Sequence, residues 1–392
     1  MKLKFHPFWI VVALATLVYG CGLCVFGRHL DFPSDMVSFY SPMGVNLAEG
    51  RGYMMNGAFT NRYPPLFPLF IAGIYKITGQ AGLSNPVYPW LIALMQAFSC
   101  GLLFLIAKTL TANTKLATAA ALLFLFYPLF AVMAVTRYAW SAMPFFIFIF
   151  FAAAWTFCLA FRQGRLRYGL ISGFLTGLSC LVWPSVIYLW AVWLPFLGLR
   201  GAGTAFRKGV LALVFMLGFL LPVSAWGVFV WRHTGAFEIS GGGMLSVRDG
   251  LWHEDSPLYG RFEIVRAARA EKKAHGLQSP AAILHLYENS FRARPLETLH
   301  FMVFKLFRVW YGTDSEKYEI PILLLQLPYF ALALWGFFAL KNNDTRLFLA
   351  ATAGYFWFIA FLVLSIVRYM MPVMGLLMIL AAVPFCRRGE RE

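Results

Sequence analysis

The chain is short of acidic residues, and all but three of them, Asp344, Glu390 and Glu392, lie in two regions. No Asp or Glu occurs between Glu49 and Glu238, a run of 188 residues. Three acids lie in a first polar segment and eleven lie from Glu238 to Glu319. An apolar chain tolerates a carboxylate only where water or a partner reaches it. The acids therefore mark the polar, functional parts of the chain, and Asp35 in the first segment is the residue to explain.

Charge of either sign is scarce, which excludes a soluble globular protein. Charged residues make up 13% of the 392 residues, hydrophobic residues make up 60%, and the mean hydropathy is +0.68. A soluble domain carries about 25% charged residues. The length allows roughly ten membrane spans of about 20 residues together with two sizeable loops. We predict an all-α integral membrane protein, residues 1–392, forming a single polytopic domain.

Several familiar signals are also absent. The six cysteines form no disulfide framework, since five lie inside apolar runs. The chain has no phosphate-binding loop, dinucleotide fingerprint or Ser-His-Asp set, which argues against a nucleotide-sugar donor. The net charge of +16 comes from basic residues spread over short loops. This pattern favours contact with anionic membrane lipids and not with nucleic acid.

Apolar runs and basic loops predict about ten spans, with both termini in the cytoplasm. Short basic loops then fall on one side of the membrane, as cytoplasmic loops do. The first loop, 27–85, and the long loop, 232–319, would lie outside the cytoplasm. The predicted spans are approximately 8–26, 87–107, 116–135, 142–161, 168–182, a sixth from Pro184 to about Leu199, 209–231, 320–340, 347–366 and 370–385.

Both outer loops contain segments that resemble interfacial helices. The apolar run from Pro65 to Thr78 is too short to cross about 30 Å of hydrocarbon, so we expect an interfacial or re-entrant helix. In the long loop, 261–276 is amphipathic, and 295–311 has the pattern of a helix at the membrane surface. The glycines of ISGGGM, 239–244, would let backbone approach a ligand.

Several motifs, taken in order, resemble a known family. The first loop reads DFPSDMVSFYSPMGVNLAEGRGY and then NRYPPLFPLF. Later come YPLF, RHTGAFEISGGG, ENSFRARPLETL and RYMMP. The order and spacing of these motifs, over most of the chain, resemble the GT-C class of membrane glycosyltransferases. Within this class, the chain resembles the bacterial family 39 enzymes, which are related to protein O-mannosyltransferases and the lipid A aminoarabinose transferase.

The resemblance implies an enzyme that moves a sugar from a polyprenyl-phosphate carrier to an acceptor outside the cytoplasm. The membrane would be the bacterial inner membrane, and the product a cell-envelope glycan. The family's first-loop Asp corresponds to Asp35, as general base for the acceptor hydroxyl, with Tyr40 beside it as an acceptor or loop residue. Asp31 is the alternative base. Asp35 could instead, or in addition, be a helix N-cap.

The carrier phosphate requires cations near the outer surface. The candidates are Arg62, Tyr63, Arg137, Arg368 and Tyr369. Arginine binds phosphate bidentately and keeps its proton, although Arg368 could also simply extend to the lipid headgroups. The chain departs from the family where a Tyr separates Arg62 from the Pro pair, where RYAWS replaces a turn that often has an acid, and where VWP replaces an Arg-Pro pair.

A metal cofactor is not expected, although a divalent ion stays possible. His253 is followed by Glu254 and Asp255, but consecutive positions are not a standard ligand spacing, so a solvated loop is the simpler interpretation. The sequence names neither the sugar, hexosyl or pentosyl, nor the acceptor, which could be a lipid, a glycan or a protein. The main alternative is a transporter or flippase of a lipid-linked saccharide, although transporters place ionisable residues near the membrane midplane. A catalytically inactive scaffold protein is the second alternative to an enzyme.

Overall fold

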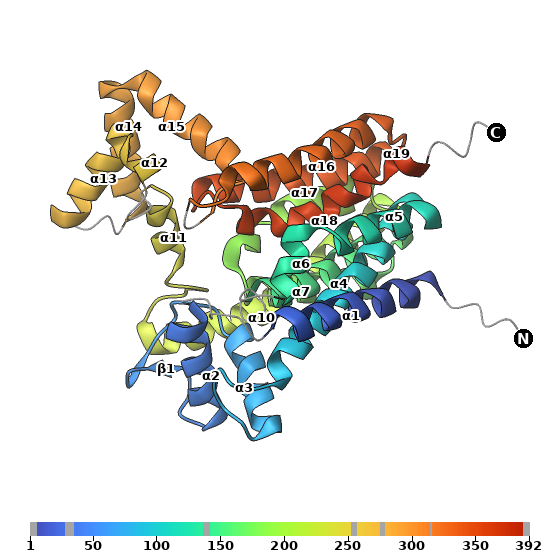
Figure 1. The fold of residues 1–392 in the computed structure, drawn as a ribbon, viewed down its shortest axis with the longest axis horizontal. Helices are drawn as coiled ribbons and strands as arrows, with labels where there is room; N and C mark the ends of the chain where they lie inside the picture. Colours follow the sequence, from blue (N-terminus) through green and yellow to red (C-terminus); the bar gives the residue numbers. More distant parts are fainter. Residues whose placement is uncertain are drawn as a thin grey trace, which may run out of the picture.

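The computed structural model describes residues 6–27, 35–135, 142–251, 257–274, 279–313 and 316–386. Within these residues the chain is helical apart from one two-stranded hairpin (Figure 1). The all-α membrane fold predicted from composition is therefore confirmed. In the described part of the chain, seven helices are long and apolar enough to cross a membrane: α1 (Pro7–Phe26), α4 (Val87–Thr111), α7 (Ala142–Gln163), α10 (Ala205–Thr234), α16 (Glu319–Ala339), α17 (Asn343–Leu362) and the C-terminal Val367–Cys386, which contains α18 (Met371–Ala381) and α19 (Val383–Cys386).

The three other predicted spans are helical but irregular. The third consists of α5 (Thr114–Leu125) and α6 (Pro128–Val135), bent by 58°, and counts as an eighth span if the pair crosses together. The fifth is the 15-residue α8 (Leu166–Cys180). The sixth is divided into a 3₁₀ turn from Pro184, α9 (Trp190–Pro195) and a π-helix ending at Arg200. For the fifth and sixth segments, membrane crossing remains a prediction.

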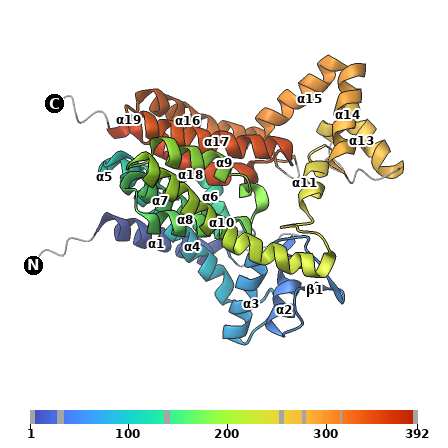
Figure 2. The same cartoon turned by 180° about the vertical axis from the view of Figure 1, so that it is seen from behind.

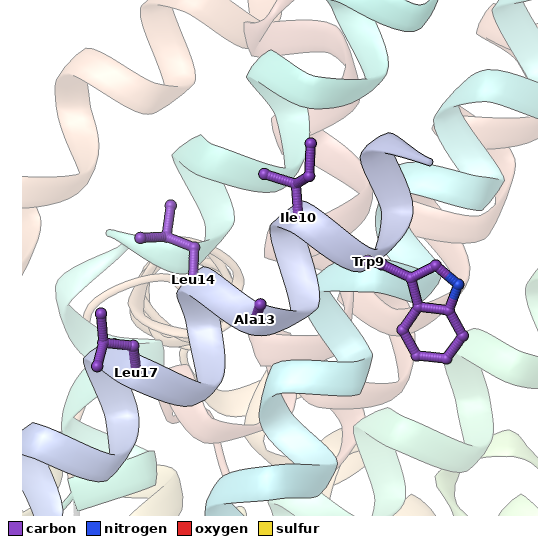
Figure 3. A pocket seen from close by; sticks show the side chains of 5 residues that line it. All are labelled: Trp9, Ile10, Ala13, Leu14 and Leu17. Carbon is purple, nitrogen blue, oxygen red and sulfur yellow. The ribbon is translucent and has the colours of Figure 1, made fainter. Parts of the chain in front are cut away.

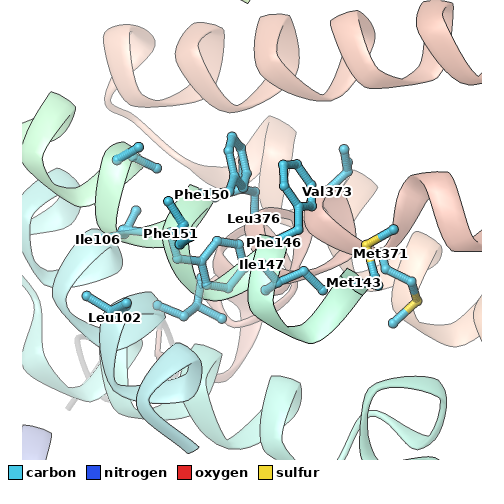
Figure 4. Close-up of a cluster of buried hydrophobic side chains, with 14 of the residues drawn as sticks. Leu102, Ile106, Met143, Phe146, Ile147, Phe150, Phe151, Met371, Val373 and Leu376 are labelled. Atoms are coloured by element: carbon cyan, nitrogen blue, oxygen red, sulfur yellow. The ribbon is translucent and has the colours of Figure 1, made fainter. Parts of the chain in front are cut away.

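Small residues let the helices of the bundle approach closely, as is usual in membranes. A Cβ on Gly173 of α8 would overlap the carbonyl of Phe215 in α10, and one on Gly218 of α10 would overlap the carbonyl of Leu170. At the centre, large apolar side chains of α7 interlock with α18 (Figure 4). The figure shows Phe146, Phe150, Phe151, Met371 and Leu376 in this cluster. The polar segments are thus attached to a rigid bundle.

The first polar segment folds into short elements at one end of the bundle. A π-helix (Met36–Tyr40) continues into α2 (Ser41–Ala48), and α3 (Leu66–Thr78) packs beside α2. The 13-residue α3 confirms the predicted short helix. Between α2 and α3, β1 (Met54–Met55) and β2 (Ala58–Phe59) form the hairpin. Its turn residues Asn56 and Gly57 have φ of 52° and 79°, the positive values that a two-residue hairpin turn requires.

The long polar segment forms a small helical unit with its own apolar core. Its helices are α11 (Gly243–Asp249), α12 (Pro257–Gly260), α13 (Glu263–Ala274), α14 (Pro280–Ala293) and α15 (Pro295–Arg308). Tyr259, Phe262, Val265, Ile283 and Phe301 are buried in this core. Helices α13 and α15 lie where the sequence predicted them.

Both polar segments lie at the same end of the bundle, opposite the end where the two termini emerge (Figures 1 and 2). The helices α2, α3 and α11 to α15 occupy this end in both views. This arrangement agrees with the prediction that the termini share one side and the two loops share the other. Which side faces the cytoplasm stays a prediction.

Candidate functional site

Asp35 begins the π-helix that opens the first polar segment. Its Oδ1 accepts a hydrogen bond of 2.9 Å from the backbone N–H of Met36, and the side chain is half-buried. The capping role that the sequence left open is therefore seen in the structure. This contact involves one carboxylate oxygen, so the capping role and a general-base role through the other oxygen are compatible.

Tyr40 is the buried centre of an aromatic group beside Asp35. Its ring is 2% exposed and packs against the rings of Tyr63 and Phe67, with centroids 5.1 Å and 4.9 Å away. Phe39 also contacts Tyr63, at 4.7 Å. These rings join the π-helix to the start of α3. The backbone that carries Asp35 is consequently held against a firm apolar support.

Arg62 and Tyr63 lie just before α3, in the same place. The guanidinium carbon of Arg62 is 5.5 Å from the centroid of the Tyr63 ring, and the Arg62 side chain is exposed. The buried Tyr53 fixes the backbone here, because its hydroxyl donates to the carbonyls of Tyr63 and Pro64 at 2.8 Å and 3.1 Å. Arg62 is thus a cation at the surface on a well-anchored turn.

The glycine-rich stretch after α10 binds the first polar segment around Arg62. The N–H of Gly241 donates to the carbonyl of Asn61 at 2.8 Å, and Ser240 Oγ donates to the carbonyl of Arg62 at 2.7 Å. A Cβ on Gly242 would lie 2.5 Å from that same carbonyl oxygen. Gly241 and Gly242 are therefore in close contact with the backbone of Asn61 and Arg62. An approach of this stretch to a ligand stays a prediction.

Arg368 enters the site from the turn between α17 and α18. Its guanidinium carbon lies 5.7 Å from the ring centroid of Trp183, and the Tyr369 ring lies 5.5 Å from the same ring. Trp183 follows the end of α8, and this end is joined to the start of α3 because the N–H of Leu66 donates to the carbonyl of Leu181 at 3.0 Å. In the family that the sequence resembles, an Arg-Pro pair often stands where this chain has Trp183 and Pro184. Here the Trp183 ring instead packs against the guanidinium of Arg368.

The charges of Asp35 and Arg368 act on the same two hydroxyl groups. Burial raises the pKa of Tyr40 well above its ordinary value, the carboxylate of Asp35 adds to the rise, and Arg368 opposes it. Burial also raises the pKa of Tyr63, while Arg62 and Arg368 oppose the rise and Asp35 adds to it. Both phenols are therefore neutral near pH 7. Asp35 and Arg368 thus influence both tyrosines, and Arg62 lies beside Tyr63.

Three predicted site residues lie outside the described residues: Asp31, Arg137 and His253. Their roles stay predictions. The described ranges contain no group of three His, Cys, Asp or Glu side chains that could hold a metal ion. The sequence HED from His253 lies in the undescribed part of the long segment.

Three contacts of this site could not be predicted from the sequence. Trp183 appeared only as a departure from the family pattern, and its contact with Arg368 joins residues that are 185 positions apart. Tyr53 and Ser240 act through hydrogen bonds to backbone carbonyls, for which no sequence signal exists. The hairpin that carries Tyr53 toward the site did have a signal, because Asn-Gly between short apolar pairs is typical of a tight turn.

Away from this site, a hollow of about 620 Å³ opens along α1. Its lining is apolar, and in Figure 3 Ile10, Leu14 and Leu17 extend to one side of the helix while Trp9 points to the other. No charged or hydrogen-bonding group except the Trp9 indole is available there. The hollow adds no group to the site around Asp35.

No family model matches the chain, and no curated protein matches it. Solved structures do match. They include an oligosaccharyltransferase from Archaeoglobus fulgidus, tethered to an acceptor peptide, with a TM-score of 0.64, 14% identity and coverage of 99% of this chain and 50% of that one. The oligosaccharyltransferase AglB from Archaeoglobus fulgidus, in complex with an inhibitory peptide and a dolichol-phosphate, has a TM-score of 0.62 and 14% identity, and the match covers 97% of this chain and 50% of that one. An oligosaccharyltransferase from the same organism in complex with Zn and sulfate has a TM-score of 0.61 and 16% identity, with the same two coverages.

These comparisons show the fold. Almost the whole chain follows the fold of a GT-C oligosaccharyltransferase, so the GT-C fold predicted from the motifs is confirmed. The chain spans about half the length of those structures. The resemblance to bacterial family 39 is not confirmed by them and stays a prediction.

Proposed function

We propose that the protein is an inverting glycosyltransferase of the membrane, which transfers a sugar from a polyprenyl-phosphate carrier to a hydroxyl of an extracytoplasmic acceptor. The observation that carries the proposal is the gathering of one carboxylate, Asp35, and two guanidinium groups, Arg62 and Arg368, around Tyr40 and Tyr63. Asp35 begins the π-helix that continues into α2, and Arg62 lies just before α3; both helices are at the end of the bundle that holds the polar segments (Figure 1).

The chemistry follows from these groups. The acceptor oxygen attacks the anomeric carbon, its proton passes to the Asp35 carboxylate, and the bond from that carbon to the phosphate oxygen breaks. The phosphate leaves on its carrier, and its negative charge is stabilised by Arg62 and Arg368. A single displacement inverts the anomeric configuration. A glycosyl phosphate already carries a good leaving group, so one base and fixed cations suffice.

The likeness to AglB supports the choice of carrier. That enzyme has been solved with a dolichol-phosphate and with an acceptor peptide, so this fold can hold an isoprenoid phosphate and a peptide together. For this chain we propose a polyprenyl-phosphate sugar, hexosyl or pentosyl, as donor, and a glycan, lipid or protein as acceptor. We place the active site on the outer face of a bacterial inner membrane.

The test is sugar transfer in membranes that contain the wild type or Asp35→Asn, supplied with radiolabelled polyprenyl-phosphate sugars. Asn keeps the shape and the capping oxygen of Asp35 but cannot accept the proton. We expect transfer to fall by at least about 100-fold, the contribution of a general base. Glu49→Gln is the matched control, since Glu49 is an exposed acid of the same segment paired with Arg51.

Each other outcome has a definite meaning. Transfer that survives in Asp35→Asn would remove Asp35 from the reaction and move the role to Asp31, tested by Asp31→Asn. Absence of transfer with every donor, at normal protein levels, would contradict the proposal. A lipid-translocation assay would then test the flippase alternative.

A further inference from the structure

Arg308 is a fully buried charge that the proposed reaction does not use. It is the last residue of α15 and is 0% exposed. Its Nη1 donates to the hydroxyl of Tyr259 at 3.2 Å and to the carbonyl of Ser365 at 3.1 Å. Its Nη2 donates to the carbonyl of Thr313 at 2.9 Å and to Glu319 Oε1 at 2.5 Å. One guanidinium thereby joins α12, α15, the start of α16 and the turn after α17.

The acceptors of Arg308 are themselves organised. Glu319 Oε1 also accepts from the N–H of Thr313 at 3.0 Å, so the carboxylate closes a ring of contacts. The Tyr259 ring lies 5.0 Å from the guanidinium carbon. A buried ion pair is stable only when such additional hydrogen bonds satisfy it, and removal of one partner is strongly destabilising because it leaves the other charge buried and uncompensated. The guanidinium is therefore held by contacts with several separate segments of the chain.

The part of the chain that Arg308 fixes is the turn that leads to Arg368. Ser365, its acceptor, lies three residues before Arg368. A second contact joins this turn to the segment just after α15: the N–H of Val367 donates to the carbonyl of Gly312 at 2.8 Å. A Cβ on Gly312 would lie 2.5 Å from the Ser365 carbonyl oxygen and 2.8 Å from Arg308 Cγ. The two segments are in direct contact, without space for a further atom.

We propose that Arg308 is a positioning residue, which holds the turn from Ser365 to Val367 so that Arg368 lies over Trp183 and faces the carrier phosphate. The importance of this position for catalysis rests on the proposed function of Arg368. Because Tyr259 belongs to the long polar segment, that segment and the phosphate-binding cation are fixed by the same side chain. A displacement of α12 is thereby transmitted to Arg368.

The first test is spectroscopic and needs no activity. In 5-fluorotryptophan-labelled protein in lipid nanodiscs, Trp183→Phe identifies the ¹⁹F resonance of Trp183, and Arg368→Gln shows how far that resonance moves when the cation is lost. We expect Arg308→Lys to move the Trp183 resonance in the same direction. Arg292→Lys is the control, since Arg292 is an exposed partner of Glu288 on α14, and it should leave the resonance unchanged.

Gly312→Ala disturbs the same contact from the other side, while the guanidinium stays in place. Gly312→Ala is the variant to measure if Arg308→Lys does not fold. We expect it to move the Trp183 resonance as well. An unchanged resonance in the folded variants would overturn the proposal.

The second test uses sugar transfer. If Arg308 acts through Arg368, Arg308→Lys raises the donor KM more than it lowers kcat, and the double variant with Arg368→Gln is no worse than Arg368→Gln alone. Additive effects would overturn the proposal. A wild type without transfer would contradict the proposed function, whereas the fluorine resonance would still decide the positioning role.

Discussion

Arg368 and Trp183 come from opposite halves of the chain, yet the guanidinium of one lies 5.7 Å from the ring centroid of the other. The contact joins the end of α8 to the turn before α18. An arginine over an aromatic face keeps its charge and its hydrogen-bond donors, while the ring restricts its orientation. Trp183 therefore restricts the orientation of the planar guanidinium of Arg368, the group that we propose binds the carrier phosphate bidentately.

The first prediction concerns this ring. Trp183→Leu should raise the KM for the polyprenyl-phosphate donor roughly fivefold, because a cation–π contact contributes about 1 kcal/mol. We expect kcat to change less than KM. The control is Trp90→Leu, at an indole that is 50% exposed on α4. Equal kinetics for Trp183→Leu and the wild type would show that the ring does not orient Arg368.

A second prediction uses two adjacent glycines with different surroundings. Gly242→Ala would place a methyl group 2.5 Å from the Arg62 carbonyl, whereas nothing lies within 4 Å of a Cβ at Gly243. Gly242→Ala should therefore displace Arg62 and reduce kcat/KM for the donor by about tenfold or more, as misplacement of a binding group does.

Gly243→Ala should keep the activity of the wild type. Both variants are measured at equal protein levels in the same membranes. Similar losses in the two variants would mean that the stretch responds to any side chain, and the specific contact with Arg62 would then be irrelevant.

The helices were predictable because apolar length and basic loops are local properties of the chain. The limits of α1, α3, α13 and α15 follow from such signals. The sixth predicted span is less regular than its apolar sequence indicates. Its apolar content agrees with a single span, yet it begins as a 3₁₀ turn at Pro184 and changes from α-helix to π-helix after Pro195, since proline removes a backbone donor and interrupts regular helix.

The site was predictable only in its list of charged residues. Asp35, Arg62 and Arg368 stood out because charge is rare in this chain. Their convergence depends on which helices are neighbours, and periodicity carries no information about this. The role of Arg308 could not be foreseen at all, because a basic residue of a polar segment gives no sign of being 0% exposed.

A third prediction tests the anchor of Tyr63. Tyr53→Phe removes the hydroxyl that donates to the carbonyls of Tyr63 and Pro64. The site is buried, so the carbonyls lose their donor without access to water, and we expect a loss of about 1–2 kcal/mol of stability. Thermal unfolding in detergent measures it as a lower Tm. Tyr188→Phe, at a ring that is 59% exposed, should leave the Tm unchanged; an equal fall in both would argue against the anchoring role.

A fourth prediction concerns Lys305, one turn before Arg308 on α15. Its Nζ lies 5.8 Å and 5.6 Å from the ring centroids of Phe301 and Phe361, and the side chain is 1% exposed. Burial lowers the pKa of Lys305 from 10.5 to about 7, because an apolar site disfavours the charged form. Above this value the folded chain holds a neutral amine, while the unfolded chain still binds a proton.

This difference fixes the sign of the pH effect. Between about pH 7 and about pH 10.5 the unfolded state binds the extra proton, so the stability of the wild type rises with pH; below about pH 7 both states are protonated and the penalty of the buried charge is complete. Lys305→Met removes the penalty. Its Tm should exceed that of the wild type most below about pH 7, and the advantage should shrink as the pH rises. Lys76→Met, at an exposed lysine of α3, is the control and should show no such trend. A Tm difference between Lys305→Met and the wild type that stays constant over this range would show that Lys305 is charged in the folded protein throughout.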